Sequence, residues 1–255
     1  MIDRKNSVAA SASSRTKSKP RKSELKRQKI VEAAAAVFRR RGYAEATLNE
    51  IAGEAGTHAG SLYYYFDGRD ELVAEVLSYS TIRLHAVAKE ALEGLPPTAD
   101  ALDRFITLVR THVCVVAERD DFSVAYQKVH DQVSDELREK VAKHPRIFAK
   151  LWDKALTDLA VEGFLRNDFD ARLLRLLLIG SITWMGDWYR PTGASTPMEI
   201  ADTLLRMFLE GGAADRQVVR RRIEALQPVA SIETIMRPDE KKRTRKRPKY
   251  VPKDD

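Results

Sequence analysis

The sequence predicts an all-α fold in two parts, a small N-terminal domain followed by a larger helical domain. Three observations support this prediction. Apolar residues recur at the three- and four-residue spacings of a helix face, no segment beyond Asp100 alternates as a strand does, and glycine and proline clusters divide the chain into helix-sized segments. With 44% hydrophobic residues in 255, the chain can bury a substantial core.

The first predicted helix begins at Ser23 and ends near Gly42. Its apolar face repeats at spacings of four, seven and eight residues and consists of Ile30, Ala34, Val37 and Phe38. The three arginines at 39–41 occupy the last turn, where cations meet the negative end of the helix dipole. Gly42 can then adopt the left-handed conformation that ends a helix.

The second predicted helix begins with a capping box at residues 47–50 (Thr-Leu-Asn-Glu). In this motif the threonine hydroxyl accepts a hydrogen bond from a backbone N–H three residues on, and the glutamate reaches back. The inward-facing residues are Leu48, Ile51, Ala52 and Ala55. Because Gly56 follows, we expect a helix of about two turns.

A third short helix is predicted to carry Leu62 and Phe66 one turn apart. The residues at 67–70 (Asp-Gly-Arg-Asp) then form a break and an N-cap. A long fourth helix is predicted over 69–92, and the Gly-Pro-Pro cluster within 94–97 ends it.

The remaining predicted helices share an amphipathic pattern and are separated by acidic, glycine or proline breaks. They span 99–118, 122–142, 145–163, 170–190 and 197–213, and residues 214–227 can extend a helix.

Positive charge is concentrated at the two ends of the chain, although the net charge is only +7. Residues 1–29 hold ten Lys and Arg against two acidic residues, and 237–255 hold nine against four, so the segment between is net acidic. This distribution is expected when affinity for a polyanion is confined to particular segments. The alternative is that the two ends only increase solubility. The composition of residues 1–22 predicts a disordered basic arm, and that of 237–255 predicts a disordered basic tail.

Several classes of protein are disfavoured. Cys114 is the single cysteine, so neither an internal disulfide nor a cysteine metal site is expected. There is no Gly-rich phosphate loop, His-Glu-x-x-His or nucleophile elbow, so we expect no enzyme, metal or cofactor. The N-terminus lacks the apolar core of a signal peptide, and residues 173–188 are too short and too charged to cross a bilayer. We therefore expect a cytoplasmic protein that does not engage a membrane.

The N-terminal pattern has the form of a helix-turn-helix. A short helix, a tight turn at Gly56 and a second short helix make the unit that places its second helix in the major groove of DNA.

The stretch at 30–72 resembles the DNA-binding domain of the TetR family of repressors. The matching residues are Ala33, Ala34, Phe38, Gly42, Thr47, Ile51, Ala52, Ala55, Gly56, Gly60, Leu62, Tyr63, Tyr65, Phe66 and Leu72. The resemblance implies a disordered arm (1–22), a helix-turn-helix domain (23–84), a ligand-binding and dimerisation domain (85–213) and a C-terminal extension with a basic tail (214–255). It also implies that double-stranded DNA is a partner.

The candidate DNA-binding residues are those outside the core of the motif, together with two lysines ahead of it. They are Thr47, Thr57, His58, Ala59, Gly60, Ser61, Tyr63, Tyr64, Lys22 and Lys26. Small side chains at Ala59 and Gly60 let the helix approach the groove closely, and Ser61 and His58 can bond base edges. Many family members carry lysine or another polar residue where this chain has Ala59. Part of the missing electrostatic attraction can come from the arm entering the minor groove.

The second domain supplies candidates for an effector cavity. They are Val109, His112, Val113, Tyr126, Trp152, Trp184 and Trp188. Most of the large apolar groups must form core. A lone histidine such as His112 or His130 is more often a surface residue or a satisfied core residue than a ligand contact.

Residues 184–193 (Trp-Met-Gly-Asp-Trp-Tyr-Arg-Pro-Thr-Gly), with the helix after Pro197, resemble the C-terminal segment of TetR members that respond to acyl-CoA thioesters of fatty-acid or steroid breakdown. The resemblance implies an acyl chain near Trp184 and Arg or Lys near the CoA phosphates. The alternative is that Trp184 and Trp188 pack at an interface.

In the family the last two helices pair with their copies in a four-helix bundle, which implies a homodimer and a palindromic operator. Gly180, Ser181 and Gly186 would permit close approach there. Two other functions stay open at this stage: a drug-responsive repressor of an efflux system, and a weakly specific architectural DNA-binding protein. The effector, the operator and the choice between repression and activation do not follow from the sequence.

Overall fold

The computed structural model describes residues 22–166, 168–212 and 215–226, and all of its regular elements are helices. In chain order they are α1 (Lys22–Glu45), α2 (Leu48–Glu54), α3 (Ala59–Leu62), α4 (Arg69–Glu93), α5 (Ala101–Ala117), α6 (Asp121–Val129), the 3-10 helix η1 (His130–Gln132), α7 (Asp135–Val141), α8 (Lys143–Val161), α9 (Ala171–Trp188), α10 (Pro197–Gly212) and α11 (Arg216–Ala225). The predicted all-α fold is confirmed. The predicted tail and all of the predicted arm except Lys22 lie outside the described residues.

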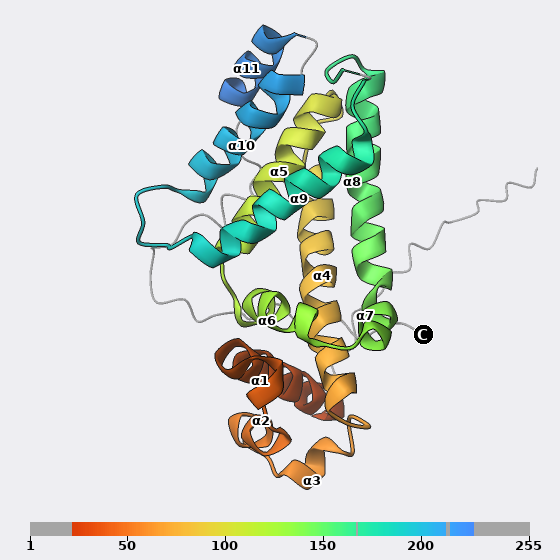
Figure 1. Cartoon of the computed structure of the whole chain (residues 1–255), viewed down its shortest axis with the longest axis vertical. Helices are drawn as coiled ribbons and strands as arrows, with labels where there is room; N and C mark the ends of the chain where they lie inside the picture. Colours follow the sequence, from red (N-terminus) through yellow and green to blue (C-terminus); the bar gives the residue numbers. More distant parts are fainter. Residues whose placement is uncertain (1–21, 167, 213–214, 227–255) are drawn as a thin grey trace, which may run out of the picture.

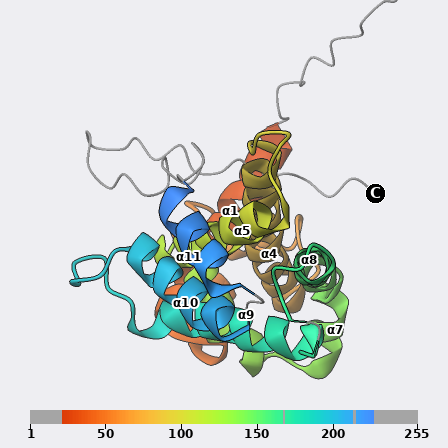
Figure 2. The same ribbon diagram turned by 90° about the horizontal axis from the view of Figure 1, so that it is seen from above.

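The helices form an elongated molecule with a small head at one end (Figure 1). The head consists of α1, α2 and α3, and α4 runs from it into the larger body. Both α6 and α7 lie between the head and the far end of the body, where α5 and α8 to α11 gather. Seen from above in Figure 2, α4 and α5 are central, with α8 on one side and α10 and α11 on the other.

The head is built on the apolar faces that the sequence predicts. Ile30 and Phe38 of α1, Ile51 of α2 and Leu62 of α3 are all buried in one cluster with Leu72 of α4. The same cluster continues into α6 through Ala125 and Val129, and into α7 through Leu137 and Val141, with Val133 between η1 and α7. The core of the head is therefore shared with the layer of helices that borders the body.

Local backbone signals act close to the predicted ends of the first two helices, although α1 continues past Gly42 to Glu45 and only the threonine half of the predicted capping box forms. Gly42 (φ 73°) kinks the end of α1, and Gly56 (φ 64°) turns the chain just after α2; both lie in the region that favours glycine. The Thr47 hydroxyl accepts from the Glu50 backbone N–H at 3.2 Å and caps α2. The Glu50 carboxylate pairs with the guanidinium of Arg41.

The predicted third helix is shorter than expected. It ends at Leu62, and Phe66 lies beyond it in a turn in which the Tyr65 and Phe66 backbone N–H groups both donate to the Leu62 carbonyl. Phe66 is nevertheless buried, and the guanidinium of Arg27 lies 4.6 Å from its ring centroid. The apolar spacing thus predicted the burial of Phe66 correctly, but it overestimated the length of the third helix.

The single helix predicted over 122–142 is wrong. The structure divides it into α6, η1 and α7, because Val133 is extended and the Ser134 hydroxyl caps α7 by accepting from the Leu137 N–H at 3.2 Å. The next helix begins at Lys143 rather than at Pro145, which sits in the first turn of α8 where no backbone donor is needed.

The body is organised around α5, whose buried faces contact α4, α8, α9 and α10. Its charged residue Arg110 is also buried and connects three elements. The guanidinium pairs with Asp202 of α10 at 2.8 Å and donates to the Ile223 carbonyl of α11 at 2.9 Å and to the carbonyl of Leu226. Arg110 therefore fastens α11 onto α5 and α10, with Val219 and Ile223 completing the apolar contact.

We predict that Arg110→Leu lowers the free energy of unfolding by about 3 kcal/mol, since breaking a buried pair leaves a carboxylate and two carbonyls without their donor. Urea denaturation at fixed protein concentration measures the change. The matched control is Arg172→Leu on the exposed side of α9, which should shift stability by less than about 0.5 kcal/mol. Equal effects of the two substitutions would contradict the anchoring role of Arg110.

Candidate DNA-binding surface and effector cavity

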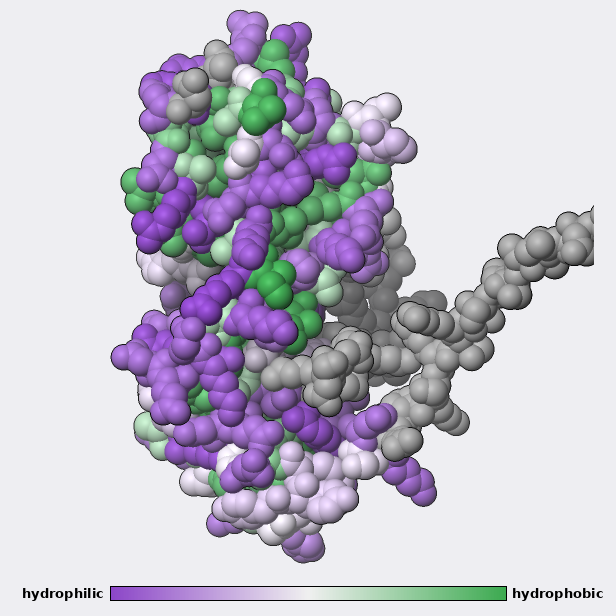
Figure 3. All heavy atoms as spheres, turned by 90° about the vertical axis from the view of Figure 1, so that its right-hand side faces the viewer, coloured by the Kyte–Doolittle hydropathy of each residue, from purple (hydrophilic) through white to green (hydrophobic). Residues whose placement is uncertain are grey.

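The candidate DNA-binding residues of the motif gather at the free end of the head. His58, Gly60, Tyr63 and Tyr64 are exposed, Tyr64 at 81%, while Leu62 between them is buried. Thr47 is exposed at the start of α2, and Thr57, Ala59 and Ser61 are partly exposed. Figure 3 shows this tip in pale colours, so its residues are of intermediate hydropathy rather than strongly charged.

The other two candidates, Lys22 and Lys26, are exposed on the first turns of α1. Arg27 beside them lies over Phe66 and pairs with Glu75 of α4 at 3.0 Å, which fixes the start of α1 against the end of the motif. Two further ion pairs hold α1 to α2: Arg40 with Glu54 at 2.8 Å, and Arg41 with Glu50 at 3.3 Å. The head can therefore present α3 as a rigid unit.

Gly60 has no structural requirement within the chain. Its backbone does not lie in the left-handed region, and a Cβ placed there would meet no atom within 4 Å. Glycine in a helix lowers stability relative to alanine by about 0.5–1 kcal/mol. The described part of the fold therefore does not require glycine at this exposed position.

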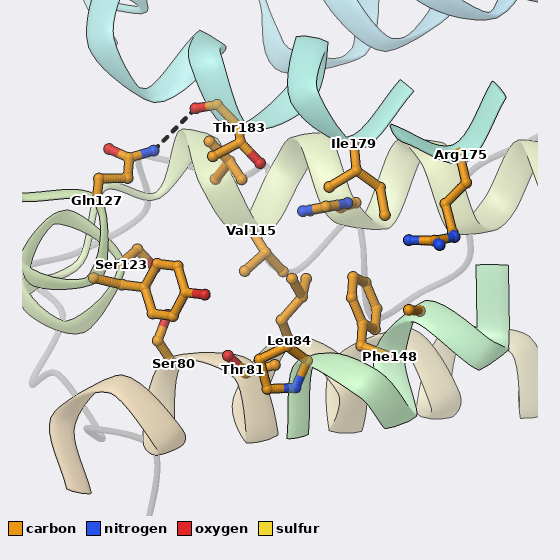
Figure 4. A pocket seen from close by; sticks show the side chains of 15 residues that line it. Ser80, Thr81, Leu84, Val115, Ser123, Gln127, Phe148, Arg175, Ile179 and Thr183 are labelled. Carbon is orange, nitrogen blue, oxygen red and sulfur yellow. Dashed lines mark hydrogen bonds between the residues drawn. The ribbon is translucent and has the colours of Figure 1, made fainter. Parts of the chain in front are cut away.

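A cavity of about 250 Å³ opens in the body between five helices (Figure 4). Its lining comes from α4, α5, α6, α8 and α9 and comprises Ser80, Thr81, Leu84, His112, Val115, Val116, Ser123, Tyr126, Gln127, Pro145, Phe148, Ala149, Arg175, Ile179 and Thr183. In Figure 4, Ser123 and Gln127 lie at one end and Arg175 at the other. The lining contains no carboxylate.

The structure divides the candidate effector residues into three groups. His112 and Tyr126 line the cavity. Val109, Val113 and Trp152 are buried in the core of the body and do not line it. Trp184 and Trp188 are exposed at 66% and 45% on α9, and their ring centroids lie 6.3 Å apart with the ring planes tilted by 60°.

Most of the lining was absent from the sequence candidates. The missed residues do follow helical spacing: Pro145, Phe148 and Ala149 share one face of α8, and Arg175, Ile179 and Thr183 share one face of α9. This periodicity identifies faces, but only the packing of the five helices shows that these faces meet.

Ionisable groups in the cavity are largely neutral or paired. Burial lowers the pKa of His112 to about 3, so its imidazole is neutral at physiological pH. Burial also raises the pKa of the Tyr126 phenol, which a hydrogen bond with Thr81 partly opposes. Arg175 pairs with Asp153 at 2.6 Å, with Asp153 half exposed. The cavity thus suits a mostly uncharged group, with one cation at its end.

The short helix α6 connects this cavity to the head. Ser123, Tyr126 and Gln127 face the cavity, whereas Ala125 and Val129 are buried in the core shared with α1. Polar links reinforce the contact with α1: Asp121 pairs with Arg39 at 2.7 Å, and the Lys128 ammonium donates to the Arg39 carbonyl at 2.7 Å.

A second set of links ties α6 to α9. The Gln127 side-chain amide donates to the Thr183 carbonyl at 3.0 Å (Figure 4), and Arg119, just ahead of α6, donates to the carbonyls of Gly186 and Tyr189. Gly186 makes room for this arrangement, since a Cβ there would overlap the Gln127 side chain.

Residues 22–166, 168–212 and 215–226 contain no group of three or more His, Cys, Asp or Glu side chains that could hold a metal ion. None of the described helices is long and apolar enough to cross a membrane.

Comparison with known proteins agrees with this geometry. Residues 30–76 match the family profile described as "Bacterial regulatory proteins, tetR family", and residues 98–212 match "Tetracyclin repressor-like, C-terminal domain". The HTH-type transcriptional repressor KstR2 of Mycobacterium tuberculosis is 29% identical over 188 residues, which are 73% of this chain and 92% of KstR2. The structure of that protein aligns with a TM-score of 0.62, at 27% identity, over 74% of this chain and 95% of its own.

Two solved structures share the fold at lower identity. AibR in complex with isovaleryl coenzyme A and operator DNA has a TM-score of 0.64 at 19% identity, covering 72% of this chain and 98% of AibR. FadR of Bacillus subtilis in complex with stearoyl-CoA has a TM-score of 0.63 at 20% identity, covering 72% of this chain and 98% of FadR. The fold, the exposed helix-turn-helix and the two family matches lead to one conclusion: this chain belongs to the TetR family and is a helix-turn-helix DNA-binding transcriptional repressor, not an enzyme.

Proposed function

We propose that this repressor acts in the cytoplasm, binds palindromic operator DNA as a homodimer and is released by an acyl-CoA thioester of lipid or steroid breakdown. DNA binding is assigned to residues 23–84, and effector binding and dimerisation to 85–213. The cavity extends across this boundary, because Ser80, Thr81 and Leu84 of α4 also line it. The observation that carries the proposal is the double role of α6. One face of this helix lines the cavity, and the other face packs against α1. A ligand in the cavity therefore acts directly on a helix that sets the position of the head.

The lining supports an acylated, anionic effector. Leu84, Val115, Phe148 and Ile179 offer an apolar surface for an acyl group. At one end, the guanidinium of Arg175 pairs with the half-exposed Asp153 through Nε and has further N–H donors for CoA phosphates. A cationic drug, the ligand expected of an efflux regulator, would need a carboxylate or a similar group, and the lining has none. Two structures that share this fold, AibR and FadR, were solved with acyl-CoA bound.

An exposed apolar stripe supports the homodimer. It runs along one face of α9 and consists of Leu173, Leu176, Leu177, Trp184 and Trp188, and Met207 is exposed on α10. An exposed apolar helix face of this kind marks an interaction site, and a twofold arrangement would cover it with its own copy. Gly180 is exposed on the same helix with open space around its Cβ position, so a partner helix can approach closely. We therefore assign Trp184 and Trp188 to the dimer interface.

The first test selects genomic fragments with the full-length chain at near-physiological salt. We expect a few enriched palindromes, each bound by two chains, because an isologous dimer presents two equivalent reading helices. Enrichment that is broad and strongly salt-sensitive would instead indicate weakly specific coating of DNA.

The selected operator then serves to test the effector. In a fluorescence-anisotropy assay, acyl-CoAs should release the operator at concentrations at which free fatty acids and cationic drugs do not, since only the thioesters combine an acyl group with phosphates. Release by cationic drugs alone would favour the efflux regulator.

Gly60 allows the DNA-binding assignment to be separated from folding. We predict that Gly60→Ala raises the free energy of unfolding by about 0.5–1 kcal/mol, because alanine is the better helix former and nothing in the chain opposes its Cβ. The same substitution should weaken operator binding at least tenfold, because the added methyl group separates α3 from the groove. The matched control is Gly53→Ala on α2, also with open space around it. Unchanged operator affinity of the Gly60 variant would contradict the close-approach interpretation.

The links between α6 and α9 suggest how release occurs. Gln127 lines the cavity and holds α9 through the Thr183 carbonyl, so α6 cannot shift relative to α9 without breaking this hydrogen bond. A hydrogen bond of this type contributes about 1 kcal/mol. Its loss would make the effector-bound arrangement easier to reach.

We predict that Gly186→Ala lowers the effector concentration for half-release about fivefold, because the new methyl group displaces the Gln127 side chain. Gln127→Ala should have the same effect, and the double variant should add nothing further. Operator titration with effector measures all three, and Gly53→Ala on α2, away from the cavity and from α9, is the control. Additive effects would show that Gly186 acts by some other route.

A further inference from the structure

Tyr43 lies directly after the kink of α1 and joins three elements of the molecule. Its backbone N–H donates to the side-chain oxygen of Gln132 in η1 at 3.2 Å. Its phenol donates to the Asp70 carboxylate of α4 at 3.0 Å, and the guanidinium of Arg69 lies 4.2 Å from its ring centroid. Tyr43 therefore connects η1 with the end of α1 and the start of α4.

The kink at Gly42 separates this contact from the packing of α6 on α1. The polar links from α6 reach Arg39, which lies ahead of the kink. The backbone turns at Gly42 (φ 73°), so the residues after it do not continue the preceding helix in register. A Cβ at Gly42 would lie 3.7 Å from the side-chain oxygen of Gln132, so η1 lies directly against the kink. η1 thus contacts the part of the head that follows the kink.

The ring of Tyr43 supports the first residue of α4. Nε and Nη2 of Arg69 are buried and have no hydrogen-bond partner among the described residues. A guanidinium over an aromatic ring is attracted to the electrons of the ring, so Tyr43 holds Arg69 in place. The first turn of α4 is also tied to the turn after α3, because the Asp67 backbone N–H donates to the Glu71 carboxylate at 2.6 Å. The position of Tyr43 therefore affects the segment that follows α3.

The other end of η1 meets the cavity wall. His130, the first residue of η1, stacks on the ring of Tyr126 with centroids 4.9 Å apart. Tyr126 lines the cavity. This three-residue helix thus contacts the cavity wall through its first residue and the head through its last, Gln132.

We infer that η1 is a second attachment of the head to the body, and that Gln132 and Tyr43 are positioning residues that set the orientation of the head for DNA. The inference goes beyond the proposed function, because it requires that the head binds DNA but not that the cavity binds an acyl-CoA. Both hydrogen bonds of Tyr43 are exposed, so each has a modest effect. Such an attachment favours the DNA-binding orientation, and a ligand can still change it.

The test measures the affinity of full-length variants for the selected operator and for a random-sequence duplex of equal length. Gln132→Met removes the oxygen that holds Tyr43 and should weaken operator binding about fivefold, because the matched orientation is less populated. Affinity for the random duplex should stay within about twofold, since it depends on phosphate attraction. Gln132→Glu keeps the oxygen and should bind both duplexes like the wild type. The matched control is Gln217→Met, at an exposed position of α11.

A double-variant cycle tests the connection between the two residues. Tyr43→Leu removes the ring and the phenol but keeps the backbone N–H, so Gln132 can still bond to residue 43 without reaching α4. Adding Gln132→Met to Tyr43→Leu should therefore change operator affinity by no more than about twofold. Additive effects, or unchanged operator affinity of Gln132→Met alone, overturn the inference. An equal loss on both duplexes also overturns it, because a smaller folded fraction would explain that result.

Hydrogen exchange of the DNA-free protein makes the test independent of the operator and of the folding of Tyr43→Leu. Peptides that cover residues 69–72 should exchange about fivefold faster in Gln132→Met than in the wild type or Gln132→Glu, because the first turn of α4 loses its attachment. Unchanged exchange overturns the inference. If the genomic selection enriches no palindrome but exchange differs in this way, the proposed operator function falls and the inference stands.

Discussion

The contact between α6 and α1 is the constraint on which the rest of the molecule depends. Ala125 and Val129 of α6 belong to the same buried cluster as Ile30 and Phe38, so the head has no complete core without a helix from the body. The other side of this two-turn helix walls the cavity through Ser123, Tyr126 and Gln127. Packed interiors do not deform continuously, so a change on one face of α6 must be accommodated by movement of the helix against α1.

The polar links around α6 are suited to such a movement. The pair between Arg39 and Asp121 is one-third to two-fifths exposed, and exposed pairs contribute about 0.2–1 kcal/mol. The hydrogen bond from Gln127 to α9 is of the same order. By contrast, the guanidinium of Arg110 is buried and holds α11 onto α5 and α10. This buried link fixes the body, while the exposed links from α6 to α1 and α9 can exchange at a cost of a few kcal/mol, within the differential affinity of one ligand.

Local features of the fold could be predicted from the sequence because their causes are local. Thr47 caps α2, and Gly42 and Gly56 turn the chain, since each acts on backbone within a few residues. The break at Val133 was missed because no glycine or proline marks it. The cavity was missed for another reason: Ser80, Gln127 and Arg175 come from three helices far apart in sequence, and only tertiary packing brings them to one space. His112 and Tyr126 were found because polar residues on apolar helix faces are conspicuous, whereas Trp152, equally conspicuous, is core.

The composition of the DNA-reading tip has a consequence for how an effector must act. With Ala59 and Gly60 at its start and no charged residue in it, α3 gains little from long-range attraction and depends on close fit. Close fit at two half-sites is sensitive to the separation and tilt of the two heads, because both helices must enter their grooves at once. The buried cluster that includes Phe38 of α1, Ile51 of α2 and Leu62 of α3 holds each head together, so a ligand has little scope to alter α3 itself. Reorientation of whole heads through α6 is therefore the route by which a small cavity can control a large and distant interface.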